Sequence, residues 1–406
     1  MKSLYLLLLL LATNAIAQDY PTPPISDLEK THIYLHTVDP GNDLYSKFGH
    51  SALRIHDEKT GWDQVYNWGI FDFSDPQFIP NFYRGILIYR LGDYPNSLAE
   101  KIYRAEGRRA IEDELSLNEE EKKRLVEKII WNTQKQNRFY NYQYYDDNCA
   151  TRIRDYIDEA VGLRLSQQTK HVSSNESFRQ RSSTYLGPLS FVWFGLNLIT
   201  NSRLDRTMSS WQQMFLPEEL RRHLSLSGFL SPTSRVIAEH RLPKQSAMIE
   251  QMILLLCEFG PILILLISIF RLTNYQIKSW LRHSTGMVLI FWGIWSSFAS
   301  VVMICNWLFS KHLDLHHNAN LLFYWPIDLI VTAWGFSFVG KEKPYLAKEW
   351  ISKNTSIFLV MKTLAVMFTV AAYHLGLISQ SIPYAQPLAM WLVILMLHLK
   401  MKTKTA

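Results

Sequence analysis

The sequence lacks the short motifs that mark several large classes of enzyme. It has no glycine-rich phosphate-binding loop and no HExxH motif, which argues against a nucleotide hydrolase and a typical zinc peptidase. Its net charge is +6, but the basic residues do not form the stripe that nucleic-acid-binding proteins carry. Many of them flank apolar segments, where basic residues set membrane topology. We therefore expect a membrane partner and no nucleic acid, metal or soluble cofactor.

The chain also has few cysteines, namely Cys149, Cys257 and Cys305. The last two lie inside long apolar runs, so Cys149 stands alone in the polar part of the sequence. In an oxidising compartment an unpaired thiol is open to oxidation and wrong pairing. A lone cysteine there indicates a reactive thiol rather than a disulfide framework. A buried, inert cysteine is the alternative.

Residues 1–17 have the features of a secretory signal peptide. Lys2 supplies the positive charge, Leu4–Ala12 forms the apolar core, and Ala15 and Ala17 make a small-x-small cleavage site. The apolar core is too short to span a bilayer, which favours cleavage over an uncleaved anchor. We therefore expect residues 18–240 to form an exported domain.

The remainder, 241–406, is predicted to be an all-α membrane domain of about five transmembrane helices. The apolar stretches are 250–270, 286–309, 319–340, 355–378 and 384–399. Segments predicted to be cytoplasmic are rich in lysine and arginine, whereas the two predicted outer loops carry only Lys311 and Asp314 as charged residues. This asymmetry follows the positive-inside rule. It predicts a multi-pass protein of the bacterial inner membrane with its exported domain in the periplasm.

Local patterns within the exported domain predict a mixture of strands and helices. Ser51–His56 and Val65–Phe73 read as strands, joined by a turn at residues 58–61. Asn118 and Glu121 make a capping box before a helix with a regular apolar face. The fold class expected for the whole chain is therefore an α+β domain followed by an all-α membrane domain.

A second helix is predicted to begin at the lone cysteine. Asn148 is a good N-cap residue, and apolar residues recur at helical spacing from Ala150 to Gly162. Cys149 would then be the first helical residue, where free N–H groups and the helix dipole stabilise an anion. We expect this position to lower the pKa of the thiol and to make it a nucleophile.

A thiol nucleophile needs a proton acceptor and donor, which is most often a histidine. His50 opens a predicted strand directly after Gly49, so its imidazole can project from the end of the strand. Papain-like sites place a histidine on a sheet opposite a cysteine at a helix start. The spacing alone leaves the other histidines of the domain open, namely His32, His36, His56, His171, His223 and His240.

The order of these residues resembles the circularly permuted papain-like superfamily, which includes NlpC-type hydrolases and relatives of lecithin:retinol acyltransferase. Four blocks are similar, more narrowly, to the Lnb-type lipoprotein N-acyltransferases. The blocks are Tyr45–Arg54, Tyr66–Phe73, Asp147–Asp155 and Met214–Leu220. They follow one another through the exported domain, and the multi-span C-terminal region fits the same family.

The resemblance implies a permuted papain-like (NlpC-type) fold for residues 18–240, with Cys149 as nucleophile and His50 as general base and acid. If the two strands pair across the 58–61 turn, Asn67 lies near His50. Its amide carbonyl would then fix the tautomer of the imidazole, although a purely structural asparagine is the alternative. The backbone N–H of Cys149 is a natural donor to the oxyanion.

Several basic residues are candidates for contact with a lipid headgroup. Arg54, Arg152 and Arg154 have the guanidinium geometry that recognises phosphate, although simple ion pairs explain them as well. His316 and His317 lie in a predicted outer loop that is expected to help position lipid. Metal binding by that loop is the weaker hypothesis, because no second cluster accompanies it.

The preferred function is acyl transfer through a thioester on Cys149. The expected donor is a phospholipid, and the expected acceptor is the N-terminal diacylglyceryl-cysteine amine of a lipoprotein. One rival is a papain-like phospholipase or cell-wall amidase/peptidase that uses the same nucleophile. The other is a non-enzymatic membrane assembly factor with a structural thiol.

Overall fold

The computed structural model describes residues 23–25, 27–71, 74–187, 190–242, 248–271, 279–339 and 349–402. The predicted signal peptide lies outside these residues. The chain forms two compact units. The first comprises Met1–Phe178 and Thr207–Gln245, and the second comprises Arg179–Arg206 and Ser246–Ala406.

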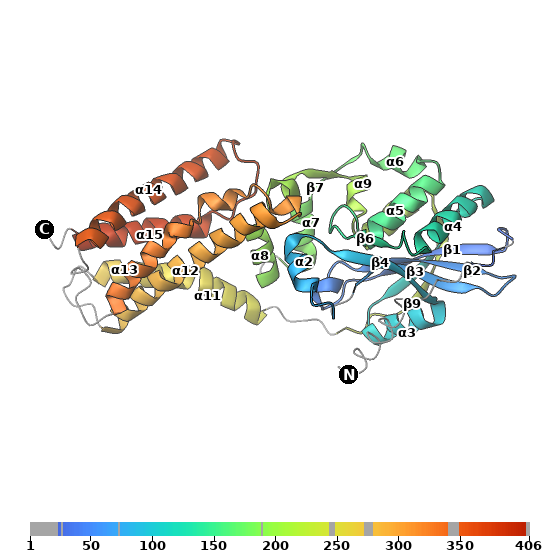
Figure 1. Ribbon diagram of the computed structural model, residues 1–406, viewed down its shortest axis with the longest axis horizontal. Coiled ribbons are helices and arrows are strands. Elements are labelled where there is room, and N and C mark those ends of the chain that lie inside the picture. Colours follow the sequence, from blue (N-terminus) through green and yellow to red (C-terminus); the bar gives the residue numbers. More distant parts are fainter. Residues whose placement is uncertain are drawn as a thin grey trace. The chain divides into compact units, whose positions relative to one another are not determined.

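The first unit is built on a seven-stranded sheet with the strand order β6-β4-β3-β2-β1-β5-β9 (Figure 1). All of its pairings are antiparallel. The strands are β1 (Thr31–Val38), β2 (His50–Asp57), β3 (Asp63–Ile70), β4 (Ile88–Pro95), β5 (Ala110–Leu115), β6 (Phe139–Asn141) and β9 (Leu230–Ala238). A separate pair joins β7 (Ser173–Ser177) to β8 (Thr207–Ser209).

The predicted pairing across the 58–61 turn is confirmed, because β2 and β3 are antiparallel neighbours. The predicted second strand is too long, because β3 stops at Ile70 and Phe71 is no longer part of it; Phe73 lies outside the described residues. A β-bulge lies between Trp68 and Ile70, where Gly69 has a φ of 109°. The bulge bends the strand just before its last pair, Ile70 with Arg90.

Helices cover both faces of the sheet (Figure 1). They are α2 (Phe78–Arg84), α3 (Asn96–Glu106), α4 (Glu119–Thr133), α5 (Cys149–Ala160), α6 (Arg164–Thr169), α9 (Ser210–Gln213) and α10 (Pro217–Leu226), with a short 3-10 turn η2 (Leu44–Ser46). Helix α7 (Phe178–Leu186) begins at the boundary between the units. The predicted capping box of Asn118 and Glu121 is confirmed at the start of α4.

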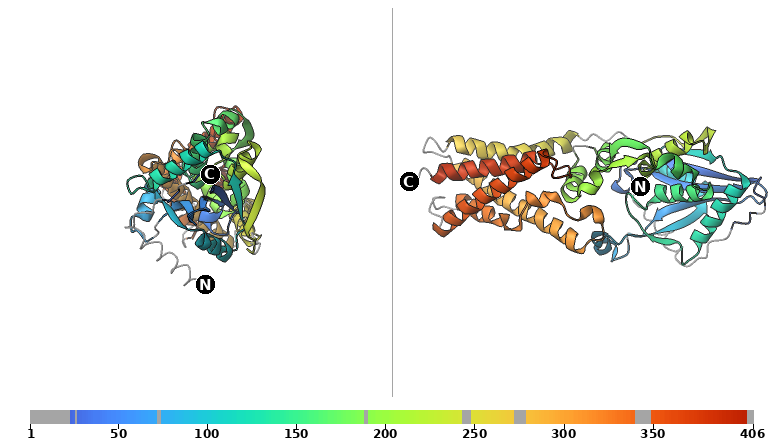
Figure 2. Two further views of the ribbon diagram at one scale, coloured as in Figure 1. Left: turned by 90° about the vertical axis from the view of Figure 1, so that its right-hand side faces the viewer. Right: turned by 90° about the horizontal axis from the view of Figure 1, so that it is seen from above.

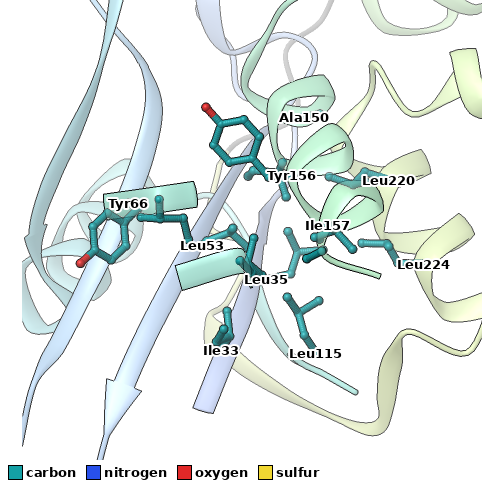
Figure 3. Close-up of a cluster of buried hydrophobic side chains, with 14 of the residues drawn as sticks. Ile33, Leu35, Leu53, Tyr66, Leu115, Ala150, Tyr156, Ile157, Leu220 and Leu224 are labelled. Atoms are coloured by element: carbon teal, nitrogen blue, oxygen red, sulfur yellow. The ribbon is translucent and has the colours of Figure 1, made fainter. Parts of the chain in front are cut away.

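The main core of the first unit lies between the sheet, α5 and α10 (Figure 3). Leu35 of β1, Leu53 of β2 and Ile157 of α5 are fully buried there, and Leu220 and Leu224 of α10 pack against the same cluster. Burial of each such side chain contributes about 1.5–3 kcal/mol. This packing fixes the position of α5 on β2, and therefore the position of Cys149.

The second unit is helical, and Figure 2 shows its long helices lying side by side. Its elements are α8 (Phe191–Ile199), η3 (Ser202–Asp205), α11 (Met248–Arg271), α12 (Ser279–Phe309), η5 (Leu313–Leu315), η6 (Ala319–Leu322), η7 (Pro326–Asp328), α13 (Leu329–Val339), α14 (Glu349–His374) and α15 (Ala385–Lys402). The α+β unit followed by a helical part confirms the predicted fold class.

Three helices among the described residues are long and apolar enough to cross a membrane: Met248–Arg271, Ser279–Phe309 and Thr355–His374. Leu313–Leu322 and Pro326–Val339 make a fourth span if the pair, bent by 43°, crosses as one. The predicted stretch 319–340 is thus not one straight helix, because the chain turns before Pro326, which cannot continue a preceding helix. The fifth stretch forms a shorter apolar helix, Ala385–Met401.

Residues 179–206 belong to the second unit, whereas the sequence placed them in the exported domain. Polar contacts explain the difference. The N–H of Phe191 donates to Glu250 of α11 (2.7 Å), and the amide of Asn201 donates to the carbonyl of Leu313 (2.8 Å). Leu198 of α8 is also part of the apolar core of this unit. The predicted boundary near residue 240 therefore misses one segment.

The core of the second unit contains a buried ion pair. Lys362 Nζ lies 3.2 Å from Asp328 Oδ2, and both side chains are fully buried. The ammonium group also faces the rings of Trp325 and Trp391, at 4.0 and 4.9 Å from their centroids. Asp328 accepts further hydrogen bonds from the Ser296 hydroxyl and the Trp325 N–H. This network joins η7 to α12 and α14.

We expect Lys362→Met to destabilise this unit by about 3–5 kcal/mol, because it leaves a buried carboxylate without its cation. The double variant Lys362→Met/Asp328→Asn should recover part of the loss, since no unpaired charge remains. Thermal unfolding of the full chain in detergent measures both effects. Equal midpoints for Lys362→Met and the unaltered protein would show that the pair does not stabilise the fold.

Candidate active site

His50 is the first residue of β2, and two glycines shape its position. Gly49 has a φ of 80°, and a Cβ there would lie 2.7 Å from the carbonyl oxygen of Val38. Only glycine fits this turn without strain. Gly69 lies across from His50 at the bulge in β3, and a Cβ there would lie 3.9 Å from the imidazole Cε1. The turn at Gly49 and the bulge at Gly69 therefore fix the position of the His50 imidazole.

The imidazole is held by an amide on the neighbouring strand. His50 Nε2 lies 2.7 Å from Asn67 Oδ1, and Asn67 Nδ2 donates to the hydroxyl of Tyr94 (2.9 Å). Because the amide oxygen can only accept, Nε2 carries the proton and Nδ1 is left as the basic nitrogen. The structure thus brings Asn67 and His50 together.

Cys149 is the first residue of α5, and Asn148 is its N-cap, as the sequence predicted. The Oδ1 of Asn148 accepts from the N–H groups of Ala150 (2.8 Å) and Thr151 (2.9 Å). Its Nδ2 donates to the carbonyl of Phe215 (2.9 Å). The cap therefore also ties the start of α5 to the segment before α10. Cys149 itself is only 8% exposed.

The packing of α5 on β2 brings Cys149 to the end of the strand that carries His50. The backbone N–H of Ser51, the residue after His50, stabilises the thiolate of Cys149. The guanidinium of Arg108 acts on the pKa of both Cys149 and His50. The thiol, the imidazole and this cation therefore share one end of the sheet.

The expectation that the helix start lowers the pKa of Cys149 is wrong. Burial raises the pKa of this thiol, and it outweighs the opposing effects of the N–H groups of Ser51, Ala150 and Cys149 and of the Arg108 charge. Burial, together with Arg108, lowers the pKa of His50 to about 4. At neutral pH the pair is therefore a protonated thiol and a neutral imidazole. Such a pair reacts by general-base catalysis rather than from a preformed ion pair.

Residues 24–180 match the family model for the Lnb N-terminal periplasmic domain, a span that includes His50, Asn67 and Cys149. This part of the chain is an Lnb-type domain. No curated protein and no solved structure matches the chain. Together with the apolar helices of the second unit, the match identifies a membrane protein with a periplasmic domain.

The four blocks that resemble the Lnb family meet around this site. The first and second blocks supply β2 and β3, and the third supplies the start of α5. The fourth contributes Phe215, which accepts from Asn148, and Pro217, whose side chain would lie 3.6 Å from a Cβ at Gly49. The fourth block, which lies outside the matched residues 24–180, thus supports both the cysteine and the histidine segments.

Arg108 is a residue of this site that the sequence did not single out. The residue is 7% exposed, and its guanidinium donates to the carbonyl of Asp39 (2.8 Å) and to Glu106 (3.0 Å). Its Nη2 is buried without a hydrogen-bond partner in the part of the chain that the structure describes. Only the sheet register revealed this location, since Val38 of β1 pairs with both His50 and Ala110.

The arginines proposed to bind a headgroup already have carboxylate partners. Arg54 binds Asp63 (2.6 Å) and Glu112 (2.8 Å), and Arg152 makes two hydrogen bonds to Asp147. Arg154 pairs with Asp155 at 2.7 Å. These contacts favour a structural role in the Lnb-type domain.

His316 and His317 belong to the second unit, not to the Lnb-type domain. His316 Nε2 lies 2.7 Å from the carbonyl of Ser310, and the ring of His317 lies 4.6 Å from that of Trp307. Their role in lipid positioning stays a prediction. Within the described residues, no group of three or more His, Cys, Asp or Glu side chains is arranged to hold a metal ion.

Proposed function

We propose that this protein moves an acyl chain from a phospholipid, through a thioester on Cys149, to the N-terminal amine of diacylglyceryl lipoproteins. The observation that carries the proposal is a buried thiol and an Asn-held imidazole at one end of the sheet in an Lnb-type domain. The Lnb family supports a role in lipoprotein processing. The thioester route is inferred from the chemistry that a thiol and an imidazole can perform together.

In the first step, His50 Nδ1 takes the proton of the Cys149 thiol as the sulfur attacks an ester carbonyl of the phospholipid. The N–H of Cys149 at the start of α5 stabilises the negative oxygen that forms. The C–O bond to the glycerol then breaks, and the imidazolium gives its proton to the leaving oxygen. A lysophospholipid departs, and Cys149 carries the acyl chain as a thioester.

In the second step, the neutral amine of the acceptor lipoprotein attacks the thioester carbonyl. His50 accepts a proton from the amine and returns it to the departing Cys149 sulfur, so the site regains its resting thiol and imidazole. An amide forms and the C–S bond breaks. Asn67 holds the tautomer that leaves Nδ1 free in both steps.

The surroundings of the site fit lipid substrates. Donor and acceptor both reside in a bilayer, and the chain carries apolar helices that are long enough to cross one. A phospholipid is an acyl donor that is present outside the cytoplasm. We place the protein in the inner membrane on the same grounds, with Cys149 on the periplasmic side.

The direct test is to trap the thioester. Intact-mass analysis of the full chain in vesicles of ester phospholipid should reveal one added acyl chain, which hydroxylamine removes. A Cys257→Ala/Cys305→Ala variant should still acquire it, because both cysteines lie in the second unit. Addition of a diacylglyceryl lipopeptide with a free amine should then transfer the chain as an amide.

Other outcomes distinguish the rivals. Release of free fatty acid, with the lipopeptide unchanged, would indicate a phospholipase. Cleavage of cell-wall peptides without any acyl adduct would indicate an amidase or peptidase. Absence of both an adduct and a product would favour a non-enzymatic assembly factor.

A further inference from the structure

Two connections of the first unit meet the His50 end of the sheet. Val38 at the end of β1 pairs with His50 at the start of β2, and Ile70 at the end of β3 pairs with Arg90 near the start of β4. The β1–β2 and β3–β4 connections therefore lie at the same end. The second of these contains helix α2.

These connections expose large apolar side chains to an unusual degree. The β3–β4 connection presents Ile79 (70% exposed) and Phe82 (55%) from α2, and Ile88 (54%) follows at the start of β4. The β1–β2 connection presents Leu44 and Tyr45, each about as exposed. We call these five residues the apolar rim. Several large exposed apolar side chains at one end of a sheet favour an interaction surface over ordinary surface variation.

A row of aromatic rings leads inward from the apolar rim to Tyr142. From Phe82 the ring centroids follow one another to Phe78 (6.4 Å), Phe71 (5.7 Å), Tyr89 (4.8 Å) and Tyr142 (4.5 Å). Every pair in this row is stacked.

The inner end of the row packs against the core cluster that contains Cys149. A thiolate on Cys149 contributes, after burial, to raising the pKa of Tyr142, so the two groups are within electrostatic reach of each other. Tyr142 also belongs to the partly buried shell of the core that contains Cys149. The apolar rim is therefore joined by packed rings to the surroundings of the nucleophile.

The charge around α2 indicates what the apolar rim contacts. Residues 76–90 contain no aspartate or glutamate, while Arg84 ends α2 and Arg90 follows in β4. The α2 part of the rim thus combines aromatic and aliphatic side chains with arginines, which matches the headgroup region of an anionic bilayer. Carboxylates border it at Asp75, before α2, and at Asp43, which accepts from the Tyr45 hydroxyl. The same chain carries candidate membrane spans, which would tether this unit to a bilayer.

We propose that the apolar rim enters the headgroup region of the outer face of the membrane and presents a long-chain phospholipid of that bilayer to Cys149. The identity of the donor rests on the proposed function, whereas the membrane contact does not. The substrate class is thus a lipid taken from the bilayer itself, not a soluble ester.

The first test uses the full chain in vesicles of ether-linked phospholipid, which has no ester to donate. One donor is a long-chain ester phospholipid placed in the bilayer, and the other is monomeric dihexanoyl phosphatidylcholine in solution. Ile79→Asp/Phe82→Asp should slow thioester formation at least tenfold with the bilayer donor and less than twofold with the soluble donor. Leu226→Asp is the matched control, because Leu226 is 72% exposed at the end of α10.

Leu226 is a suitable control because it lies near the end of the sheet opposite to His50. It shortly precedes Leu230, which pairs with Leu115 at one end of β5, whereas the His50 end of the sheet is marked by Ala110 at the other end of β5. The control variant should therefore be unaltered with both donors. Equal rates for the Ile79→Asp/Phe82→Asp variant and the unaltered protein with the bilayer donor would overturn the proposal.

A second test does not depend on acyl transfer. A photoreactive benzoylphenylalanine at position 82 should crosslink to phospholipid in proteoliposomes, and the same group at position 226 should not. This readout decides the matter if the double aspartate variant loses activity with both donors or fails to fold. Crosslinking without any thioester in the unaltered protein would contradict the proposed function alone. Absence of lipid crosslinks at position 82 would contradict the membrane contact.

Discussion

Cells in which Cys149→Ala is the sole copy of this protein are expected to lose N-acylation of their lipoproteins by at least about 1,000-fold. The reason is that alanine offers no atom to carry the acyl chain. Cys149→Ser should fail nearly as badly, because a hydroxyl needs a stronger base than an imidazole with a pKa of about 4. Mass spectrometry of N-terminal lipopeptides from the cells measures the loss.

Two controls separate chemistry from folding in this experiment. The serine variant keeps nearly the volume of the buried thiol, so its thermal midpoint should stay close to that of the unaltered protein. Cys305→Ala changes a cysteine of α12 in the second unit and should retain N-acylation. Unaltered N-acylation in the Cys149→Ala cells would rule out the thioester mechanism.

The second large effect is expected at the imidazole. His50→Gln should slow thioester formation by about 100- to 10,000-fold, which is the usual range for removal of a general base. Because the resting thiol is protonated, Cys149 cannot attack without a proton acceptor. Acylation rates of the full chain with a fixed phospholipid donor measure the loss.

The pH profile of the same reaction carries a distinct signature. Protonation of His50 removes the base, so the rate of the unaltered protein should fall as the pH drops through about 4. In the His50→Gln variant this acid limb should disappear. The residual rate should instead rise with pH, as hydroxide ionises the thiol without help. His56→Gln, at the other end of β2, should keep the original profile.

The folding stability of the protein should also depend on the protonation of His50. It should fall as the pH is lowered, whereas a histidine paired with a carboxylate loses its contribution as the pH is raised. The folded state lowers the pKa of His50 from 6.5 to about 4, so it favours the neutral imidazole. The unfolded chain therefore binds the proton first, and the contribution of His50 to stability is lost as the pH falls from about 6.5 towards 4. A His50→Gln variant that shows the same acid destabilisation would contradict this assignment.

Much of the local structure of the site follows from short stretches of sequence. Asn148 caps the helix that Cys149 begins because its side chain reaches N–H groups only two and three residues away. The pairing of β2 with β3 follows from their alternating apolar residues and the turn between them. Cys149 could therefore be singled out from local sequence, whereas the choice of His50 over the other histidines needed the family resemblance and that of Asn67 needed the expected strand pairing.

Other features of the site depend on residues that are distant in the sequence. Arg108 lies near His50 because β1 pairs with both β2 and β5, and no local pattern indicates this. The apolar rim appears only when two connections meet at one end of the sheet. Residues 179–206 join the second unit because their partners, such as Glu250 and Leu313, come from that part of the chain.

The sequence by itself determined which helix begins at the thiol, which strands flank the imidazole and which stretches are apolar enough for a membrane. Each of these depends on hydrogen bonds or periodicity within a few residues. Tertiary structure alone decided the protonation state of the pair. Desolvation where the start of α5 meets the end of the sheet raises the pKa of Cys149 and lowers that of His50. Desolvation depends on every surrounding element, so it outweighed the helix-start effect that the sequence predicted.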